Sequence, residues 1–370
     1  MRIPGLDLLR AIAIAWVMLF HSFLVGGLGE QWDWLSRYGW MGVDLFFVLS
    51  GFLIGHQVLA PLARGETFSF RDFYLRRAFR ILPAFWVVLA VYLLVPAFAE
   101  APAMEPAWKF LAFIVNLDID YANNAAFSNA WSLCVEEHFY LVFPVLAWAM
   151  VRRSSPRGVL ALCVGLVLAG IAVRSAVWLH DTATAPARNW FVEDIYYPTW
   201  CRLDGLLAGV VLAVVRVFRP GLWEWLSQRA NAVLAAGVLV MALALWLFRE
   251  RTGLLGNSIG WPVLSTGLAL LVCAAAQRHG AIGRWRVPGM AWLAAISYSL
   301  YLVHKPVFHL VGTYWGEAIA GRGLLTFVVY AAASLGAGAL LHYLVERPGL
   351  ALRGRLLSRR RLVAEAAPAA

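Results

Sequence analysis

Residues 6–22 read LDLLRAIAIAWVMLFHS, a stretch that is almost entirely apolar but contains an arginine and a histidine. A run of this length is close to the ~20 residues that a helix needs to cross the hydrocarbon core of a bilayer. Arg10 and His21 are eleven positions apart. A helix turns about 100° per residue, so the two side chains lie near one face, about 16 Å apart along the axis. The stretch therefore predicts a spanning helix with a cation and an imidazole on one side.

The composition of the whole chain supports the same interpretation. The 370 residues are 62% hydrophobic and 14% charged, whereas soluble domains carry about 25% charge. The formal net charge is +10, and nearly all the basic residues are arginine. Without any motif for RNA or DNA, this excess indicates contact with anionic membrane lipids and a topology signal, so we expect no nucleic-acid partner. The four cysteines have neither metal spacing nor a disulfide framework, and we expect no bound metal.

Hydropathy predicts an all-α, polytopic membrane protein with about ten transmembrane helices. Residues 108–119 form a further apolar piece that is too short to cross easily. If this piece is a re-entrant or interfacial segment, all the arginine-rich connections lie on one side, as the positive-inside rule requires. Both termini are then cytoplasmic. The ten predicted spans are 7–25, 41–59, 81–98, 131–151, 158–179, 199–217, 230–248, 259–277, 292–312 and 323–345.

The domain organisation follows from these spans. We expect one membrane domain over residues 1–350 and a cytoplasmic tail over residues 351–370 that is basic and then alanine-rich. The first stretch contains Asp7 and Arg10 and lacks a small-residue cleavage site, so we do not expect a cleavable signal peptide.

Ionisable groups near the outer ends of the first two helices are the first candidate site. Such groups are costly inside a bilayer and usually face a cavity or a partner. Asp44 begins the second span close to His21, so it could orient the imidazole and raise its basicity. The alternatives are simpler: Arg10 could snorkel to the inner interface, while His21 and Asp44 could cap helix ends.

The stretch WSLCVEEHFYLVFP, residues 131–144, contains two adjacent carboxylates in the outer half of the fourth span. Neighbouring side chains on a helix point about 100° apart, so both cannot face one cavity equally. Glu136 shares a face with Tyr140 and is the preferred site residue, ahead of Glu137. The alternative is that the glutamates, with Ser132 as a cap, only decorate the first turns of the helix.

Two further pairs lie on other helices. Arg77 and Arg80 are three positions apart at the inner boundary of the third span, where they could form a fork for phosphates. Contact with lipid headgroups is the alternative for them. Tyr301 and His304 lie one turn apart within the ninth span.

These segments together resemble the acyltransferase-3 family of bacterial integral membrane O-acyltransferases. The resemblance runs from residue 6 to about residue 348, with its motifs in the expected order. Cys134 and His138 stand where the family more often has serine and glutamine. The motifs are Arg10 with His21, GVDLFFVLSGFLI (42–54), RRAFRILP (76–83), WSLCVEEHFY (131–140) and SYSLYLVHKPV (297–307).

The resemblance implies a ten-helix enzyme of the bacterial cytoplasmic (inner) membrane. Such enzymes take an acyl group from acyl-CoA, often acetyl-CoA, on the cytoplasmic side. Typical acceptors are extracytoplasmic hydroxyls of lipopolysaccharide, exopolysaccharide or peptidoglycan sugars, and in some members small molecules. Some relatives carry an additional extracytoplasmic domain, so we expect that a second step in this case would need a partner protein.

The residues can be assigned to the steps that O-acylation requires. An acceptor hydroxyl needs a base, for which we expect His21 held by Asp44, and the thioester oxyanion needs a cation, for which Arg10 is placed. We expect Glu136 to complete the catalytic group in a cavity through the membrane, which His304 also lines. Direct transfer and a covalent acyl-enzyme both remain open. The residues that we expect to bind the donor are Arg77, Arg80, Tyr301 and His304.

Two other classes of protein are alternatives. A proton-coupled secondary transporter would also use intramembrane histidine and carboxylate groups, but inverted repeats typical of that class are not evident. A structural lipid-binding protein would explain the arginines but not the carboxylate beside His21.

Overall fold

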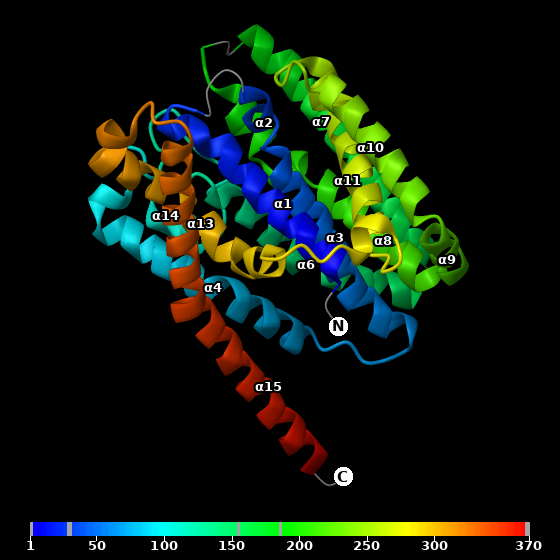
Figure 1. The fold of residues 1–370 in the computed structure, drawn as a ribbon. Helices are drawn as coiled ribbons and strands as arrows, with labels where there is room; N and C mark the ends of the chain where they lie inside the picture. The colour runs from blue at the N-terminus through cyan, green and yellow to red at the C-terminus, as the bar shows by residue number, and fades with distance from the viewer. Residues whose placement is uncertain (1–2, 28–31, 154–155, 185–186, 367–370) are drawn as a thin grey trace. The chain divides into compact units, whose positions relative to one another are not determined.

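The computed structural model describes residues 3–27, 32–153, 156–184 and 187–366, and this part of the chain is predominantly helical (Figure 1). Within it, eight helices are long and apolar enough to cross a membrane, or nine if the bent pair α8 and α9 counts as one span. This confirms the predicted all-α, polytopic class. The eight are Pro4–Val25, Met41–Ala63, Phe70–Leu94, Ala130–Val151, Arg157–Thr184, Ala230–Leu247, Gly256–Ala275 and Leu324–Leu357.

The predicted spans at 199–217 and 292–312 take less regular forms. α8 (Asp204–Phe218) and α9 (Pro220–Gln228) are bent by 106° at a short break, so this span is broken. α13 (Met290–Ile319) has 30 residues, which is ample length for a bilayer, but it contains several polar groups and is not among the eight apolar helices. The other eight predicted spans each correspond to an apolar helix.

The short apolar piece at 108–119 does not form a spanning helix. Only α5 (Ala107–Leu111) is regular there, and its five residues cover about 7.5 Å. Turns follow it, with Phe113 at a φ of 56°. The prediction that this piece does not cross the membrane is thereby confirmed.

The contacts divide the chain into two compact units. The first comprises residues 1–68 and 101–295, and the second comprises residues 69–100 and 296–370. Besides the helices already given, the first unit contains α1 (Pro4–Phe20), η1 (His21–Val25), α2 (Asp33–Arg37), α3 (Met41–Ala63), α6 (Ala130–Arg153), α7 (Pro156–Thr184), η3 (Phe191–Tyr196), η4 (Thr199–Cys201), α10 (Ala230–Leu247), η5 (Gly256–Gly260), α11 (Trp261–Ala275) and α12 (Ala281–Arg284). The second contains α4 (Phe70–Leu94), η2 (Pro96–Phe98), most of α13, α14 (Leu324–Leu341), η6 (His342–Glu346) and α15 (Arg347–Ala366).

Close contact between α3 and α8 organises the first unit. A Cβ added at Gly51 would lie 2.0 Å from the carbonyl oxygen of Leu206, and one at Gly209 would lie 2.3 Å from that of Val48. Neither position can hold a side chain, so the two backbones meet directly, as small residues allow in membrane helices. This approach sets the start of α8 against the N-terminal half of α3.

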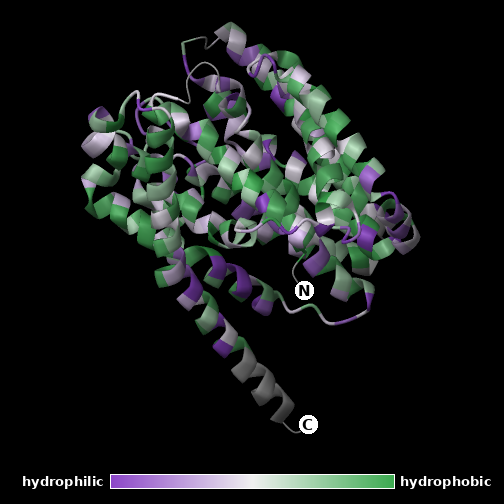
Figure 2. Ribbon diagram, in the orientation of Figure 1, coloured by the Kyte–Doolittle hydropathy of each residue, from purple (hydrophilic) through white to green (hydrophobic). Residues whose placement is uncertain are grey.

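The second unit ends in a nearly continuous helix. α14 passes through the π-helical turn η6 into α15, so the last apolar helix runs to Leu357, beyond the predicted end at 345. The start of α4 is hydrophilic in Figure 2, where its arginines lie. The proposed boundary between domain and tail at residue 350 stays a prediction.

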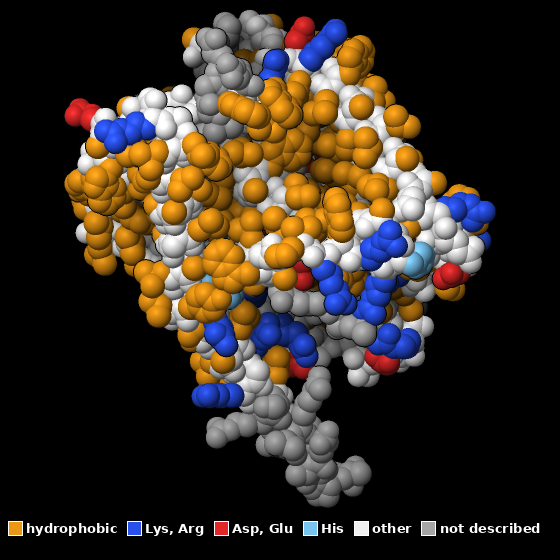
Figure 3. Space-filling view, in the orientation of Figure 1, with side chains coloured by type: hydrophobic (Ala, Val, Ile, Leu, Met, Phe, Trp, Pro, Cys, Tyr) orange, Lys and Arg blue, Asp and Glu red, His pale blue; other side chains and the backbone are white. Residues whose placement is uncertain are grey.

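Large hydrophobic side chains remain exposed on the helices of both units, as the orange surface of Figure 3 shows. Examples are Leu168 on α7, Leu239 on α10 and Leu340 on α14, which are 60%, 71% and 62% exposed. Exposed apolar area on this scale marks a surface that another apolar phase covers. Together with the helix lengths, it identifies a multi-pass membrane protein.

Candidate functional site

A three-residue polar cluster joins the middle of α3 to α6. The Ser50 hydroxyl donates to Glu136 Oε1 at 2.7 Å, and the Tyr140 hydroxyl lies 2.8 Å from Glu136 Oε2. The Tyr140 hydroxyl is also 3.0 Å from Ser50 Oγ. Tyr140 is buried, whereas Ser50 and Glu136 are half-buried. The predicted shared face of Glu136 and Tyr140 is confirmed, and Ser50 completes the group from another helix.

Arg10 and His21 lie at the two ends of the polar stripe predicted on the first helix. Arg10 lies beside Asp7, with 3.3 Å between Nη1 and Oδ1, and a third of its side chain is exposed. α1 ends at Phe20, and His21 begins the 3₁₀ turn η1. His21 Nδ1 lies 3.0 Å from the carbonyl oxygen of Val17. Because a carbonyl can only accept, Nδ1 carries the hydrogen and the basic lone pair is at Nε2.

The predicted pairing of Asp44 with His21 is wrong. Asp44 Oδ1 accepts from Arg202 Nη2 at 2.8 Å, and Oδ2 has no hydrogen-bond partner among the described residues. The physical reason is the close packing of α3 on α8, which brings the carboxylate against the residues that precede α8. Both groups are almost fully buried. Asp44 therefore neutralises a buried cation instead of orienting an imidazole.

Aromatic rings surround the guanidinium of Arg202. Its central carbon lies 3.9 Å from the ring centre of Trp261, 4.4 Å from that of Tyr196 and 4.9 Å from that of Trp131. Arg202 Nη1 also donates to the carbonyl oxygen of Tyr196 at 3.0 Å. A cation in this position is stabilised by ring quadrupoles as well as by Asp44. Arg202 is 1% exposed, so the described residues enclose its side chain almost completely.

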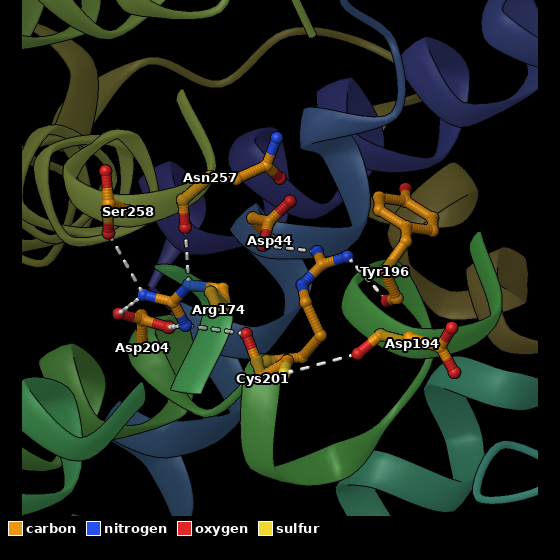
Figure 4. A network of polar contacts seen from close by, with 9 residues as sticks. Asp44, Arg174, Asp194, Tyr196, Cys201, Asp204, Asn257 and Ser258 are labelled. Carbon is orange, nitrogen blue, oxygen red and sulfur yellow. Dashed lines mark hydrogen bonds and ion pairs between the residues drawn. The ribbon is translucent and has the colours of Figure 1, made fainter. Parts of the chain in front are cut away.

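A second buried ion pair lies nearby, as Figure 4 shows. Arg174 makes two hydrogen bonds to Asp204, at 2.8 and 3.1 Å. It also donates to the carbonyl oxygens of Cys201 and Asn257, at 2.7 and 2.8 Å, and so joins α7, the loop before α8 and the π-helical turn η5. Arg202 and Asp204 are only two positions apart, but each pairs with a residue of another helix. Arg202 pairs with Asp44 on α3, and Asp204 pairs with Arg174 on α7.

In the second unit, the predicted phosphate fork contacts a buried carboxylate. Arg80 Nη1 forms an ion pair with Glu346 Oε1. Glu346 is 1% exposed, and its Oε2 accepts from Ser299 at 2.7 Å and from His342 Nδ1 at 2.9 Å. Arg76, Arg77 and Arg80 all lie within electrostatic range of Arg353 on α15. This end of the second unit therefore gathers several arginines, of which Arg80 contacts Glu346.

Tyr301 and His304 are both buried in α13 of the second unit. His304 Nδ1 donates to the carbonyl oxygen of Tyr301 at 2.8 Å, and their ring centres are 5.7 Å apart. The one-turn spacing predicted from the sequence is therefore present.

The next residue of α13 belongs to a buried ion pair. Lys305 Nζ lies 2.7 Å from Glu100 Oε1, and Tyr92 donates to Glu100 Oε2 at 2.7 Å. Burial by itself would raise the pKa of Glu100, but the charge of Lys305 and the two hydrogen bonds hold that pKa below its ordinary value. Glu100 is therefore a carboxylate that fixes the end of α4 to α13.

The structure thus places the eight predicted residues in separate groups. Arg10, His21, Asp44 and Glu136 belong to the first unit, and Arg77, Arg80, Tyr301 and His304 belong to the second. Sequence reasoning missed Ser50, although it is the one hydroxyl within the quoted stretch 42–54. Within the described residues, no group of three or more His, Cys, Asp or Glu side chains could hold a metal ion.

The family model and the similar curated proteins agree on one family. The family model of an acyltransferase domain, acyltransferase-3, matches residues 3–343. The chain is 30% identical over 328 residues to YrhL of Bacillus subtilis, which is provisionally named a peptidoglycan O-acetyltransferase. It is 27% identical over 335 residues to the peptidoglycan O-acetyltransferase OatA of Listeria monocytogenes, and 25% identical over 329 residues to the O-acetyltransferase OatA of Staphylococcus aureus.

The coverage of these matches is unequal. They include 83%, 83% and 85% of this chain but 49%, 50% and 52% of the three relatives, so the chain spans about half the length of the curated proteins it matches. No solved structure matches the chain.

Proposed function

The chain belongs to the acyltransferase-3 family, and we propose that it is a membrane O-acetyltransferase that moves an acetyl group from acetyl-CoA to a hydroxyl of a cell-envelope sugar. The observation that carries this proposal is the family match over residues 3–343, which includes every predicted motif. The acceptor we favour is a peptidoglycan or related glycan, because three similar proteins bear O-acetyltransferase names and two of those names specify peptidoglycan.

In this reaction His21 acts as the base at the acceptor. A sugar hydroxyl does not ionise near neutral pH, so attack on an acyl carbon requires a group that removes its proton. The hydrogen bond from Nδ1 to Val17 supports this role because it leaves the basic lone pair at Nε2. Asp44 has no part in the proposal as an orienting group, since it is engaged with Arg202.

Arg10 supplies positive charge for the oxyanion that forms at the thioester carbonyl. Its partial exposure supports the role, because a substrate could reach the guanidinium. Asp7, one helical turn earlier, balances the charge in the resting protein.

Arginines of the second unit bind the phosphates of the donor. Guanidinium groups form paired hydrogen bonds to phosphate, and Arg77 and Arg80 lie one turn apart on α4. Arg353 adds a third cation to the group. Glu346 fixes the direction of Arg80, and we assign Tyr301 and His304 to the same donor-binding function.

The direction of transfer follows from the arginine distribution. We propose that the protein lies in the bacterial cytoplasmic membrane with both termini in the cytoplasm, because this arrangement puts the arginine-rich connections inside. The CoA phosphates then bind from the cytoplasm, and the sugar approaches from the outer ends of α1 and α3.

The test uses the purified full chain, acetyl-CoA and a glycan acceptor, with release of free CoA as the readout. We expect acceptor-dependent release in the wild type and a loss of about 10²–10⁴-fold in His21→Ala, the usual contribution of a general base. His180→Ala, which changes an exposed histidine on α7, is the matched control.

Two results would contradict the proposal. Full activity of the folded His21→Ala protein would remove His21 as the base. Solute uptake by proteoliposomes without acyl-CoA, in a wild type that releases no CoA, would favour a transporter instead. Mass spectrometry of envelope glycans from a strain lacking the gene identifies the acceptor through the ester that is lost.

A further inference from the structure

Ser50 occupies an unusual position for a serine in a spanning helix. It is the tenth residue of α3, about 13.5 Å from the start of a helix that has 23 residues. The hydrocarbon core is about 30 Å thick, so the hydroxyl lies near its middle. Serines in such helices commonly donate back to the carbonyl one turn earlier. Ser50 has a single hydrogen to donate, and it goes to Glu136 on α6.

The contacts of Ser50 are those of an activated nucleophile. A serine hydroxyl becomes reactive when an adjacent base accepts its proton and a further group fixes that base. Glu136 accepts at 2.7 Å, and Tyr140 fixes both partners through its distances of 2.8 Å to Glu136 Oε2 and 3.0 Å to Ser50 Oγ. Ser50 and Glu136 are only half-buried, so the pair has a face that the protein does not cover.

We propose that Ser50 carries the acetyl group as a covalent ester between the two substrates, a step that rests on the proposed acetyltransferase function. Ser50 Oγ attacks the thioester carbonyl, Glu136 takes the hydroxyl proton, a C–O bond forms and the C–S bond breaks. CoA leaves as the thiolate, which is favourable because thiols have a much lower pKa than alcohols, and takes the proton that Glu136 holds.

The second half returns the protein to its starting state. The acceptor hydroxyl attacks the serine ester, and Glu136, which is a carboxylate again, takes its proton. In this route Glu136 has the role that His21 has in direct transfer, because α1 and α3 run antiparallel and Ser50 lies level with the start of α1, far from His21. As the bond between the acyl carbon and Ser50 Oγ breaks, Glu136 returns its proton to that oxygen. The acetyl group is thereby transferred through a point near mid-membrane, between a donor on one side and an acceptor on the other.

The experiment is acceptor-free labelling of the detergent-purified full chain with acetyl-CoA that carries radiolabel in the acetyl group. We expect about one equivalent of CoA to be released in a burst and the label to remain on the denatured protein, as covalent catalysis predicts. Peptide mapping of the wild type should place the label on Ser50. This mapping does not depend on the folding of any variant.

Three substitutions sharpen the assignment. Ser50→Ala should lose both the label and at least 10²-fold of acceptor-dependent turnover, about the contribution expected of such a group. Ser50→Cys should keep the label as a thioester, which neutral hydroxylamine releases, whereas the serine ester resists it. Ser265→Ala, which changes a buried serine on α11, is the matched control and should keep full labelling.

The outcomes separate this inference from the proposed function. If the wild type transfers acetyl groups but Ser50→Ala does so at the same rate, or the label maps to another residue, the ester on Ser50 is excluded while the acetyltransferase remains. If the wild type releases no CoA with acetyl-CoA and any envelope glycan tested, the proposed function fails, and the inference fails with it.

Discussion

Two polar clusters of the first unit lie on the same helix, α3, yet they differ in burial and in the charges they hold. Asp44 and Arg202 form an ion pair in which both residues are at most 2% exposed, and aromatic rings surround the cation. Six residues along the helix, Ser50 meets Glu136, which has hydroxyl partners and keeps part of its surface open. An ion pair that is buried this fully is suited to support the fold, whereas a half-buried carboxylate with a hydroxyl beside it can also react.

This difference matters because the sequence gives both clusters the same appearance. Each consists of an ionisable residue inside an apolar run, and such residues are functional candidates by default in a membrane protein. The partners decide between the two roles. A guanidinium cancels the charge of Asp44, while two hydroxyl groups leave Glu136 able to take up a proton.

The largest effect should come from breaking the buried ion pair. Arg202→Ala leaves Asp44 buried without its cation, and such a change typically costs about 3–5 kcal/mol of folding free energy. We expect a lower unfolding temperature in detergent and a loss of folded protein, with activity falling in proportion to the folded fraction. Arg249→Ala, which changes an exposed arginine, should stay within about 0.5 kcal/mol of the wild type. A stable Arg202→Ala protein with no activity would instead make this cluster catalytic.

Glu136→Gln should lower turnover and leave stability nearly unchanged, which is the opposite of the effect expected for Arg202→Ala. Glutamine keeps the size of the side chain and can still accept from Ser50, but it cannot take up a proton, so we expect turnover to fall by about 10²-fold. The unfolding temperature should change little. Glu224→Gln, on the exposed side of α9, is the matched control for both measurements. Unchanged turnover would show that Glu136 has only a structural role.

The sequence predicted what depends on neighbours along the chain and missed what depends on helix packing. Glu136 and Tyr140 are one turn apart, so their contact could be predicted from helix geometry alone. Arg202 is 158 residues away from Asp44. No local sequence pattern predicts the glycine-lined contact of α3 and α8 that brings the two residues together. Ser50 was missed for the same reason, because its acceptor lies on another helix.

The boundaries of single helices are also predicted only in part by the sequence. Hydropathy placed the start of the third span at residue 81, but α4 begins at Phe70, where the Ser69 hydroxyl accepts from the backbone N–H of Asp72. That cap starts the helix about three turns before the predicted position and so includes the arginine-rich residues 70–80. The hydropathy pattern therefore detects the apolar part of α4 but not its polar first turns.

The arginines of α4 extend the comparison to the second unit. Replacing Arg77 and Arg80 with glutamine removes two charged donors, and we expect the KM for acetyl-CoA to rise by about tenfold while kcat changes less. Arg71→Gln, an exposed arginine on the same helix, is the control. Because Arg80 also pairs with Glu346, the unfolding temperature of the double variant must be measured too. An unchanged KM would assign these arginines to lipid contact and topology.

The smallest effect, and the most direct test of the comparison, should come from Tyr140→Phe. The phenylalanine keeps the ring in place but removes one hydroxyl, whose hydrogen bond is worth about 1 kcal/mol. If Tyr140 positions Ser50 and Glu136 for reaction, kcat should fall by about fivefold at unchanged KM and nearly unchanged unfolding temperature. Tyr314→Phe, on an exposed part of α13, should leave all three quantities unaltered. A loss of stability with normal kcat per folded molecule would place this cluster beside Asp44 and Arg202, as a second polar contact that only holds helices together.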